Sequence, residues 1–161
     1  MTATVTIREY QATDIDDVIA IAQDLQRHER QFHDRMKPPT EIGAGYVAYM
    51  QSNVAKRQGK FLVAEHQGEV VGFATLLTHC DSAEDEEEVF FTYAVIADLS
   101  VREGARNIGI GRSLVTACEN IARSDGVKWL RLYALTDNLD ALRFYDRAGF
   151  KPRLVQMEKA L

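Results

Sequence analysis

Apolar residues recur along this chain with two spacings, which predict alternating helices and strands. A helix headed by Thr13 carries apolar residues on one face, and Asp16 completes a capping box at its start. A second helix is predicted from about residue 45 to residue 57, after the proline pair at 38–39. Runs rich in β-branched and aromatic residues predict strands at 5–8, 61–66, 70–77, 90–101 and 129–134.

The same alternation continues towards the C-terminus. Residues 113–122 have apolar side chains at helical spacing, and Gly126 closes that helix. Asn138 opens a last helix, which Gly149 ends in a left-handed cap, and residues 151–157 return as a final strand. The order β-α-α-β-β-β-α-β-α-β predicts an α/β fold in which a mixed sheet has helices on both faces.

The overall composition is that of an ordinary globular protein. The 161 residues are 46% hydrophobic and 27% charged, which predicts one domain over residues 1–161. No apolar run approaches the ~20 residues that cross a bilayer, and residues 1–10 lack the apolar core of a signal peptide, so no membrane partner is expected. The net charge of −5 argues against nucleic acid as a partner. Cys80 and Cys118 lack the spacing of a metal site, so we expect no metal. We expect both to be free thiols in a reducing cytoplasm.

The segment Arg106-Asn107-Ile108-Gly109-Ile110-Gly111 stands between a predicted strand and a predicted helix. This layout directs the N–H groups of a loop and a helix start towards one point, which suits a phosphate or pyrophosphate. The two glycines let a ligand approach where a Cβ would intrude. Neither the Walker loop nor the dinucleotide fingerprint fits, because Ile110-Gly111 replaces Lys-Ser/Thr in the first and Leu114 replaces the third glycine in the second. An ordinary strand-to-helix turn is the alternative interpretation.

Residues 138–150 carry a second motif, Asn-x-x-Ala-x-x-Phe-Tyr-x-x-x-Gly-Phe. Together with the loop at Arg106, it resembles the GCN5-related N-acetyltransferases, the superfamily that moves an acetyl group from acetyl-CoA to an amine. The two motifs stand in the family's order, with a helix and a strand between them. The resemblance runs roughly from Ile7 to the C-terminus and is sharpest from Leu99 to Phe150. It implies the family's fold, a central mixed and mostly antiparallel sheet with helices on both faces.

The resemblance also assigns residues to acetyl-CoA, which the family binds as a co-substrate. The implied pyrophosphate cradle uses main-chain N–H groups, with two arginines as charge partners, and comprises Arg106, Asn107, Ile108, Gly109, Ile110, Gly111 and Arg112. The pantetheine arm runs like an extra strand along Leu99, Ser100 and Val101. Asn138 contacts the cofactor arm in the family, and its alternative role is that of a simple helix N-cap.

Tyr145 matches the family's tyrosine near the CoA sulfur. The leaving group of the reaction is a thiolate with a pKa of about 8.5, so a proton donor beside the sulfur assists its departure. The resemblance therefore assigns the catalytic proton donor to Tyr145. The alternative role is a core aromatic beside Phe144.

The group that deprotonates the amine is not assigned by the sequence. The family often has a glutamate on the strand that carries the pantetheine, and here Ile96-Ala97-Asp98 stands in its place. Strand alternation puts Asp98 on the opposite face from Ala97. A polar group follows the first helix, where family members often contact the acceptor, and consists of His28, Glu29, His33 and Asp34.

Two functions are compatible with these residues. The first is an acetyl-CoA-dependent N-acetyltransferase acting on a primary amine of a small molecule or a peptide, and the resemblance adds a homodimer. The second is a non-catalytic module that binds or senses acyl-CoA. Tyr145 favours the enzyme, because a binding module has no need of a proton donor for a thiolate. The acidic run at 81–88 is either a solvated connection or a surface that attracts a cationic amine.

Overall fold

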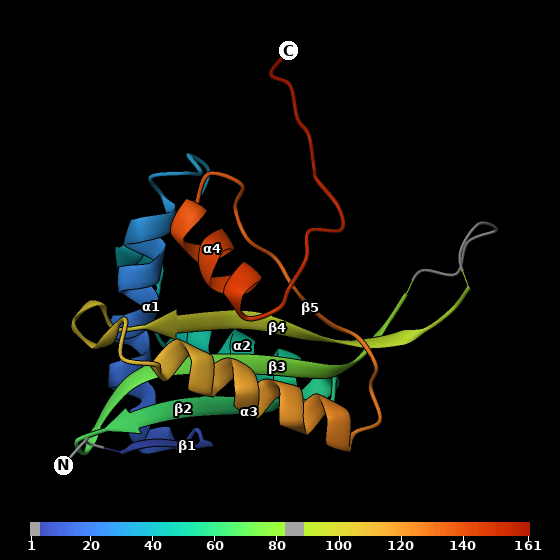
Figure 1. The fold of residues 1–161 in the computed structure, drawn as a ribbon. Coiled ribbons are helices and arrows are strands. Elements are labelled where there is room, and N and C mark those ends of the chain that lie inside the picture. Colours follow the sequence, from blue (N-terminus) through green and yellow to red (C-terminus); the bar gives the residue numbers. More distant parts are fainter. Residues whose placement is uncertain (1–3, 83–88) are drawn as a thin grey trace.

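The computed structural model describes residues 4–82 and 89–161 (Figure 1). Its strands are β1 (Val5–Glu9), β2 (Lys60–His66), β3 (Glu69–Asp81), β4 (Thr92–Val101) and β5 (Leu130–Leu132). Its helices are α1 (Ile15–Glu29), α2 (Ala44–Lys56), α3 (Ile110–Ser124) and α4 (Leu139–Arg147). The sheet has the order β1-β2-β3-β4-β5 and is antiparallel except for the parallel pair β4–β5. The predicted α/β fold with a mixed, mostly antiparallel sheet is confirmed.

Helices cover both faces of this sheet. Figure 1 shows α3 and α4 in front of the sheet, with α1 and α2 on the other side. The core on the α3 side includes Leu76, Ala94, Ile96, Leu114, Val115 and Cys118. The core on the α1–α2 side includes Val18, Ile21, Val47, Met50, Val63 and Phe73. The strands β2 and β3 are buried on both faces, which explains why they are apolar at nearly every position.

The start of α1 differs in detail from the prediction. A 3₁₀ turn (Ala12–Asp14) precedes the helix, which begins at Ile15 rather than at Thr13. The N–H of Gln11 donates to Asp14 at 2.8 Å, so Asp14 takes the capping role that the sequence pattern gave to Asp16. The Arg8 guanidinium fixes Asp14 by donating to both of its carboxylate oxygens, at 2.8 and 2.9 Å. This pair ties β1 to the start of α1.

A β-bulge interrupts β4 at Ala97. Leu76 pairs with Ile96 and Thr75 pairs with Asp98, so Ala97 is the extra residue on β4. Ile96 packs in the core on the α3 side, and strict alternation would put Asp98 there as well. The bulge changes the alternation, so that Leu99 returns to the α3 side and Asp98 faces α2. No residue type or spacing in the sequence predicts this bulge.

The predicted final strand at 151–157 is wrong. Residues 151–161 form neither a strand nor a helix, and every one of them is exposed. A strand requires a neighbour for its N–H and C=O groups, and Figure 1 shows this segment running away from the sheet. Most of the acidic run at 81–88 lies outside the described residues. None of the helices in the described part of the chain is long and apolar enough to cross a lipid bilayer.

Candidate functional site

The backbone of β4 beyond the bulge has an open edge. The parallel pairing with β5 covers only Ala94, Val95 and Ile96. Among the described residues, no strand pairs with the outer edge of β4 from Ala97 to Val101. The predicted pantetheine residues Leu99, Ser100 and Val101 all lie in this stretch. Their outward N–H and C=O groups suit an extended ligand that pairs like a strand.

The loop after β4 leads directly to the start of α3. Asn107 and Gly109 both have positive φ, at 66° and 94°, and Gly109 is the N-cap of α3. Helix geometry leaves the first N–H groups of α3 without helical acceptors, at Ile110, Gly111 and Arg112. These donors and the positive end of the helix dipole favour an anion at this point. Asn107, Ile108 and Gly109 are exposed, as a ligand-binding loop requires.

The two glycines of the motif have different structural roles. A Cβ on Gly109 would meet nothing within 4 Å, so this position combines open space with a left-handed backbone. A Cβ on Gly111 would lie 3.2 Å from the Phe144 ring and 3.8 Å from Val101. Gly111 therefore lets α3 pack against α4 and β4. The space around it is filled by protein, whereas the space around Gly109 is open to a ligand.

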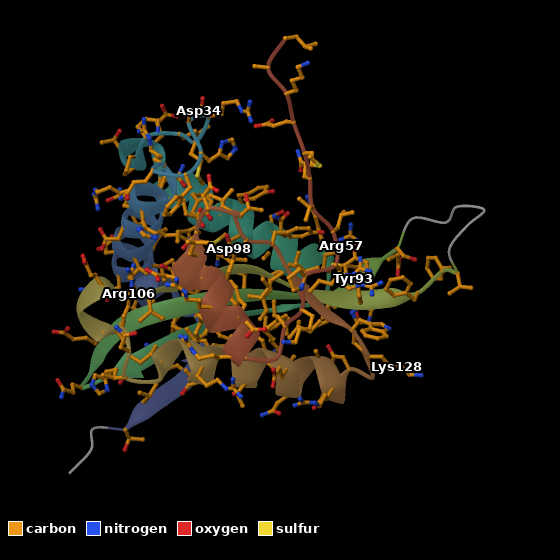
Figure 2. All side chains as sticks on the ribbon, turned by 45° about the horizontal axis from the view of Figure 1, so that its top comes forward. Asp34, Arg57, Tyr93, Asp98, Arg106 and Lys128 are labelled. Atoms are coloured by element: carbon orange, nitrogen blue, oxygen red, sulfur yellow. The ribbon has the colours of Figure 1, made fainter. Side chains whose placement is uncertain are left out.

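The two arginines of the motif also differ. Arg106 donates from Nε to the Val101 carbonyl at 3.0 Å, which places its guanidinium between the open edge of β4 and the loop (Figure 2). Arg112 donates from Nη1 to the Arg147 carbonyl at 3.0 Å. That contact satisfies a carbonyl at the C-terminal end of α4. Arg106 is thus exposed at the loop before α3, and Arg112 joins the start of α3 to the end of α4.

Asn138 caps α4, as one of its two predicted roles requires. Its side-chain oxygen accepts a hydrogen bond from the Ala141 N–H at 3.2 Å, and the residue is buried. The cap uses the oxygen of the amide and leaves the NH₂ group as a donor. The N-cap and the contact with the cofactor arm are therefore compatible.

Tyr145 lies on α4, half-buried between two aromatic rings. Its ring makes edge contacts with Phe144 and Phe150, at centroid distances of 5.2 and 5.9 Å. Burial, together with the negative charge of Glu29, raises the pKa of Tyr145 to about 12. The hydroxyl therefore stays protonated at neutral pH and lies close enough to Glu29 for that charge to act on it.

Asp98 occupies a fixed position below α2. Its carboxylate accepts a hydrogen bond from the Tyr46 hydroxyl at 2.8 Å and a second from the Thr75 hydroxyl. Burial and the charge of Asp98 raise the pKa of Tyr46, which stays a neutral donor. Two neutral donors hold this carboxylate in place without cancelling its charge.

Glu29, at the end of α1, interacts electrostatically with Asp98 and with the two tyrosines described above. Burial raises its pKa, and the charge of Asp98 adds to that effect, while His28 and His33 oppose it. The charge of Glu29 also acts on Tyr46 and Tyr145. Glu29, Tyr46, Asp98 and Tyr145 thus form one interacting group, here called the polar cluster. It brings together residues from α1, α2, β4 and α4 at the inner end of the open edge of β4.

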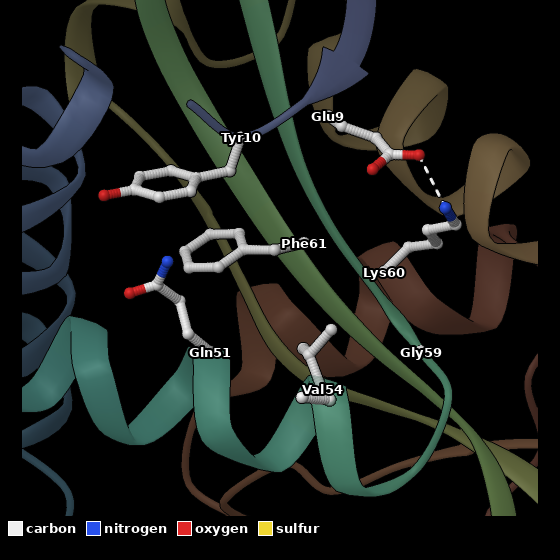
Figure 3. Close-up of a pocket in the computed structure, with 8 residues that line it drawn as sticks. Glu9, Tyr10, Gln51, Val54, Gly59, Lys60 and Phe61 are labelled. Atoms are coloured by element: carbon white, nitrogen blue, oxygen red, sulfur yellow. Dashed lines mark hydrogen bonds and ion pairs between the residues drawn. The ribbon is translucent and has the colours of Figure 1, made fainter. Parts of the chain in front are cut away.

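Two cavities lie near the helices of the α1–α2 layer. One, of about 170 Å³, lies between α1 and the loop before α3 and is lined by Asp24, Arg27, His28, Gln31, Glu103 and Arg106. It connects the end of α1 with the predicted anion site. The other, of about 240 Å³, lies between α2 and the ends of β1 and β2 (Figure 3). Its lining contains the Lys60–Glu9 ion pair but no residue of the loop or of the polar cluster.

The sequence carries a signal for every loop residue of this site and for three members of the polar cluster, but not for Tyr46. Tyr46 and Thr75 carried no motif, and Asp98 was placed by simple alternation. Glu29 was noted only as one of four polar residues after the first helix. In the sequence, Glu29 is only an acidic residue at the end of an amphipathic helix. Its role in the site becomes visible only in the fold, which brings it close to Asp98 and Tyr145.

Comparison with known proteins assigns most of the chain to one family. Residues 20–150 match the family model described as Acetyltransferase (GNAT) family. The mycothiol acetyltransferase of Sanguibacter keddieii is 35% identical over 102 residues, which are 63% of this chain and 31% of that protein. This chain therefore spans less than a third of the length of that curated relative.

Solved structures have the same fold. A tetramutant of the BH1408 protein from Bacillus halodurans superposes with a TM-score of 0.85 at 21% identity, covering 97% of this chain and 99% of that one. The aminoglycoside N-acetyltransferase AAC(6')-Iy, solved in complex with CoA, superposes with a TM-score of 0.70 at 14% identity, covering 100% and 98%. At these identities the likeness establishes the fold alone. Because the family model matches well over half of the length of this chain, the chain belongs to the acetyltransferase (GNAT) family.

Proposed function

We propose that this protein is an acetyl-CoA-dependent N-acetyltransferase that acts on a primary amine of a small molecule or a peptide. The observation that carries the proposal is the open edge of β4, which joins the anion site at α3 to the polar cluster. Family membership supports an acetyl donor, and a structural neighbour was solved with CoA bound. One relative is named a mycothiol acetyltransferase and one structural neighbour an aminoglycoside N-acetyltransferase, but we argue the acceptor from this chain's own residues.

In this proposal the cofactor lies along one continuous surface. Its pyrophosphate accepts hydrogen bonds from N–H groups between Asn107 and Arg112, and Arg106 supplies a positive charge. The pantetheine arm pairs with the backbone of Leu99, Ser100 and Val101. The free NH₂ group of Asn138 donates to that arm while its oxygen caps α4.

The amine meets the two carboxylates of the polar cluster. An amine with a pKa near 10 arrives protonated and must lose a proton before it can attack a thioester. Asp98, held by Tyr46 and Thr75 through its two carboxylate oxygens, attracts the cation. Burial raises the pKa of Glu29, which suits a proton acceptor. We assign the proton transfer to Glu29, directly or through one water.

Acetyl transfer then requires a donor at the sulfur. The neutral amine attacks the carbonyl carbon, a tetrahedral intermediate forms, and the C–S bond breaks to release the CoA thiolate. Tyr145 is protonated at neutral pH and donates its hydroxyl proton to that sulfur, which leaves as the CoA thiol. The second proton of the amine nitrogen, released as the amide forms, returns to the tyrosinate directly or through water. Holding both substrates in position contributes on the order of 7–11 kcal/mol to lowering the barrier.

The polar cluster also separates the enzyme from a non-catalytic acyl-CoA-binding module. Cofactor binding needs the loop and the edge of β4, and it gains nothing from two interacting carboxylates. Burying Glu29 near Asp98 costs stability, since each negative charge disfavours the other. A structure that retains such a cost at the inner end of its cofactor surface is typical of a catalytic site.

The test is a screen of acceptors that measures release of free CoA from acetyl-CoA. Polyamines, aminoglycosides, amino sugars and peptide amines represent the amine class, and their hydroxyl or N-acetyl analogues are matched controls. The proposal predicts release with at least one amine and with none of its blocked analogues. Tight acetyl-CoA binding without release for any amine would instead favour the binding module.

A further inference from the structure

Arg131, on β5, is stacked on two aromatic rings that precede and begin β4. Its guanidinium carbon lies 4.2 Å from the centre of the Tyr93 ring and 5.0 Å from the centre of the Phe91 ring. Such stacking fixes the plane of a guanidinium and leaves the N–H donors at its edge. Within residues 4–82 and 89–161, no group accepts a hydrogen bond from the Arg131 side chain and no carboxylate pairs with it.

A guanidinium held in this way is suited to an oxyanion. Its planar fork matches the two oxygens of a carboxylate, and such bidentate pairs are among the stronger hydrogen bonds in proteins. Because the rings already restrict the side chain of Arg131, binding an anion costs it little further conformational entropy. Arg57, directly after α2, adds positive charge at the same end of the sheet (Figure 2). Burial raises the pKa of Cys80, the cross-strand partner of Tyr93, and the charge of Arg57 opposes that rise.

Arg131 shares a face of the sheet with Asp98. The β4 residue after Tyr93 packs in the core on the α3 side, so strand alternation turns Tyr93, with the guanidinium on its ring, to the α2 side. The bulge turns Asp98 to that side as well, where Tyr46 donates to it. Tyr133 directly follows β5, which runs parallel to β4, so it lies further towards Asp98 than Arg131 does, and it is 79% exposed. This face therefore carries a carboxylate at the polar cluster and a guanidinium nearer the start of β4.

The distance between these two charges determines the length of a ligand that contacts both. Arg131 pairs with Val95, three residues before Asp98, and its side chain reaches back over Tyr93, five residues before Asp98. At about 3.3 Å per strand residue, these separations are roughly 10 Å and 16 Å. An extended peptide covers this range with about three to five residues. A free amino acid or a single amino sugar is too short.

We propose that the acceptor is an extended peptide with an acidic side chain three to five residues from its reactive amine. Arg131 binds the acidic side chain while the amine lies at the polar cluster. The inference rests on the proposed acetyl transfer and narrows its acceptor from amines in general to one class of peptide. Arg131 is then a specificity-determining residue, because it contacts the acceptor and none of the reacting atoms.

The first test compares peptides by the release of free CoA from acetyl-CoA. The peptides are six residues long, uncharged apart from the stated groups, and amidated at the C-terminus, with a free N-terminal amine or one lysine as the only amine. We expect kcat/KM to be about tenfold higher with glutamate four residues after the amine than with glutamine there. Glutamate next to the amine should give no such advantage, because it cannot reach Arg131. Equal values for the distant glutamate and glutamine overturn the proposal.

The two levels of the account fail in different ways. Release of CoA with small amines, at a rate that no acidic peptide exceeds, contradicts the peptide acceptor and leaves acetyl transfer intact. No release with any amine contradicts acetyl transfer, and this inference with it.

The second test assigns the preference to Arg131. Arg131→Gln should lower kcat/KM about tenfold for the peptide with the distant glutamate, mainly through KM, and leave its glutamine counterpart unchanged. Arg131→Lys keeps the charge but lacks the planar fork, so it should retain part of the preference. Lys128→Gln, which removes an exposed charge just before β5, is the control and should behave as the wild type. An undiminished preference in Arg131→Gln, or an equal loss for both peptides in a variant that circular dichroism shows to be folded, overturns the proposal.

Discussion

The hydroxyl of Tyr46 donates a 2.8 Å hydrogen bond to Oδ1 of Asp98, joining α2 to the strand that carries the open edge. The contact exists because the bulge at Ala97 turns Asp98 towards α2. Together with the Thr75 hydroxyl, it holds the carboxylate that we assign to attracting the amine. Tyr46 itself is a positioning residue, since it acts through Asp98.

Tyr46→Phe should weaken acceptor binding more than it slows the chemical step. The variant keeps the ring and its packing but removes one of the two donors that hold Asp98. We expect KM for the amine to rise several-fold, with a smaller change in kcat and no change in acetyl-CoA affinity. Steady-state kinetics with an identified amine measure both parameters. Equal losses for the amine and for acetyl-CoA would show a structural role instead.

Glu29→Gln should lower activity while leaving the protein at least as stable as the wild type. Burial raises the pKa of Glu29, so its ionised form is disfavoured in the folded state at neutral pH, and an uncharged amide removes that cost. We expect kcat to fall by about 10²–10⁴-fold, in line with the loss of a general base. Thermal unfolding should show an equal or higher midpoint. Glu41→Gln, on the surface before α2, is the control and should change neither property.

The pH dependence gives a separate readout for the same residue. Below its raised pKa, Glu29 is neutral and cannot accept the proton, so the rate should fall on the acid side at a higher pH than an ordinary glutamate would give. In Glu29→Gln this acid limb should be absent. An identical acid limb in both proteins would assign it to another group.

Tyr145→Phe should slow the reaction without weakening the binding of acetyl-CoA. The substitution keeps the edge contacts with Phe144 and Phe150 and removes the only proton that the residue can offer. We expect kcat to fall by about 10²–10⁴-fold when chemistry limits the rate. Calorimetry should give an unchanged Kd for acetyl-CoA. Wild-type turnover under these conditions would remove Tyr145 from the mechanism.

The Arg8–Asp14 pair predicts how stability depends on pH. Hydrogen bonds from Arg8 hold the pKa of Asp14 below its ordinary value. The stability gained is complete above the unfolded-state pKa of about 3.9 and is lost as pH falls through the folded-state pKa. Asp14→Asn should therefore lose about 1–3 kcal/mol at neutral pH and less in acid. Asp17→Asn breaks only a surface pair with Arg102 and should lose less than about 1 kcal/mol, as urea unfolding at several pH values can measure.

The sequence predicts those parts of the structure that are encoded locally. Helical and strand periodicity gave the order of elements, and the caps at Asn138 and Gly149 are where residue type alone favours them. The bulge at Ala97 has no such signal, because it arises from the pairing of β4 with β3 on one side and β5 on the other. The role of Gly111 was also hidden, since it depends on Phe144 from another helix.

Predictions of features that depend on distant parts of the chain were wrong or incomplete for a related reason. The segment 151–157 has the composition of a strand, but strand formation depends on a neighbour that periodicity cannot supply. The polar cluster draws one residue from each of four elements, so no single stretch of sequence contains it. Glu29 gains its significance only because the fold places it near the charge of Asp98 and near the neutral hydroxyl of Tyr145.

Binding of acetyl-CoA at the loop before α3 is central to the proposed function, and Gly109 offers a matched test. Gly109 and Gly126 flank the same helix, both have positive φ (94° and 73°), and a Cβ on either meets nothing within 4 Å. Gly109→Glu and Gly126→Glu should thus have similar conformational costs, while only the first puts a negative side chain where the pyrophosphate binds.

The measurement is calorimetric titration of acetyl-CoA into the wild type and the two variants, after circular dichroism has established that all are folded. We predict at least a tenfold weaker Kd for Gly109→Glu, a loss of about 1.4 kcal/mol or more. Gly126→Glu should bind as the wild type does. Equal affinity for all three proteins would contradict the assignment of the cofactor to this loop.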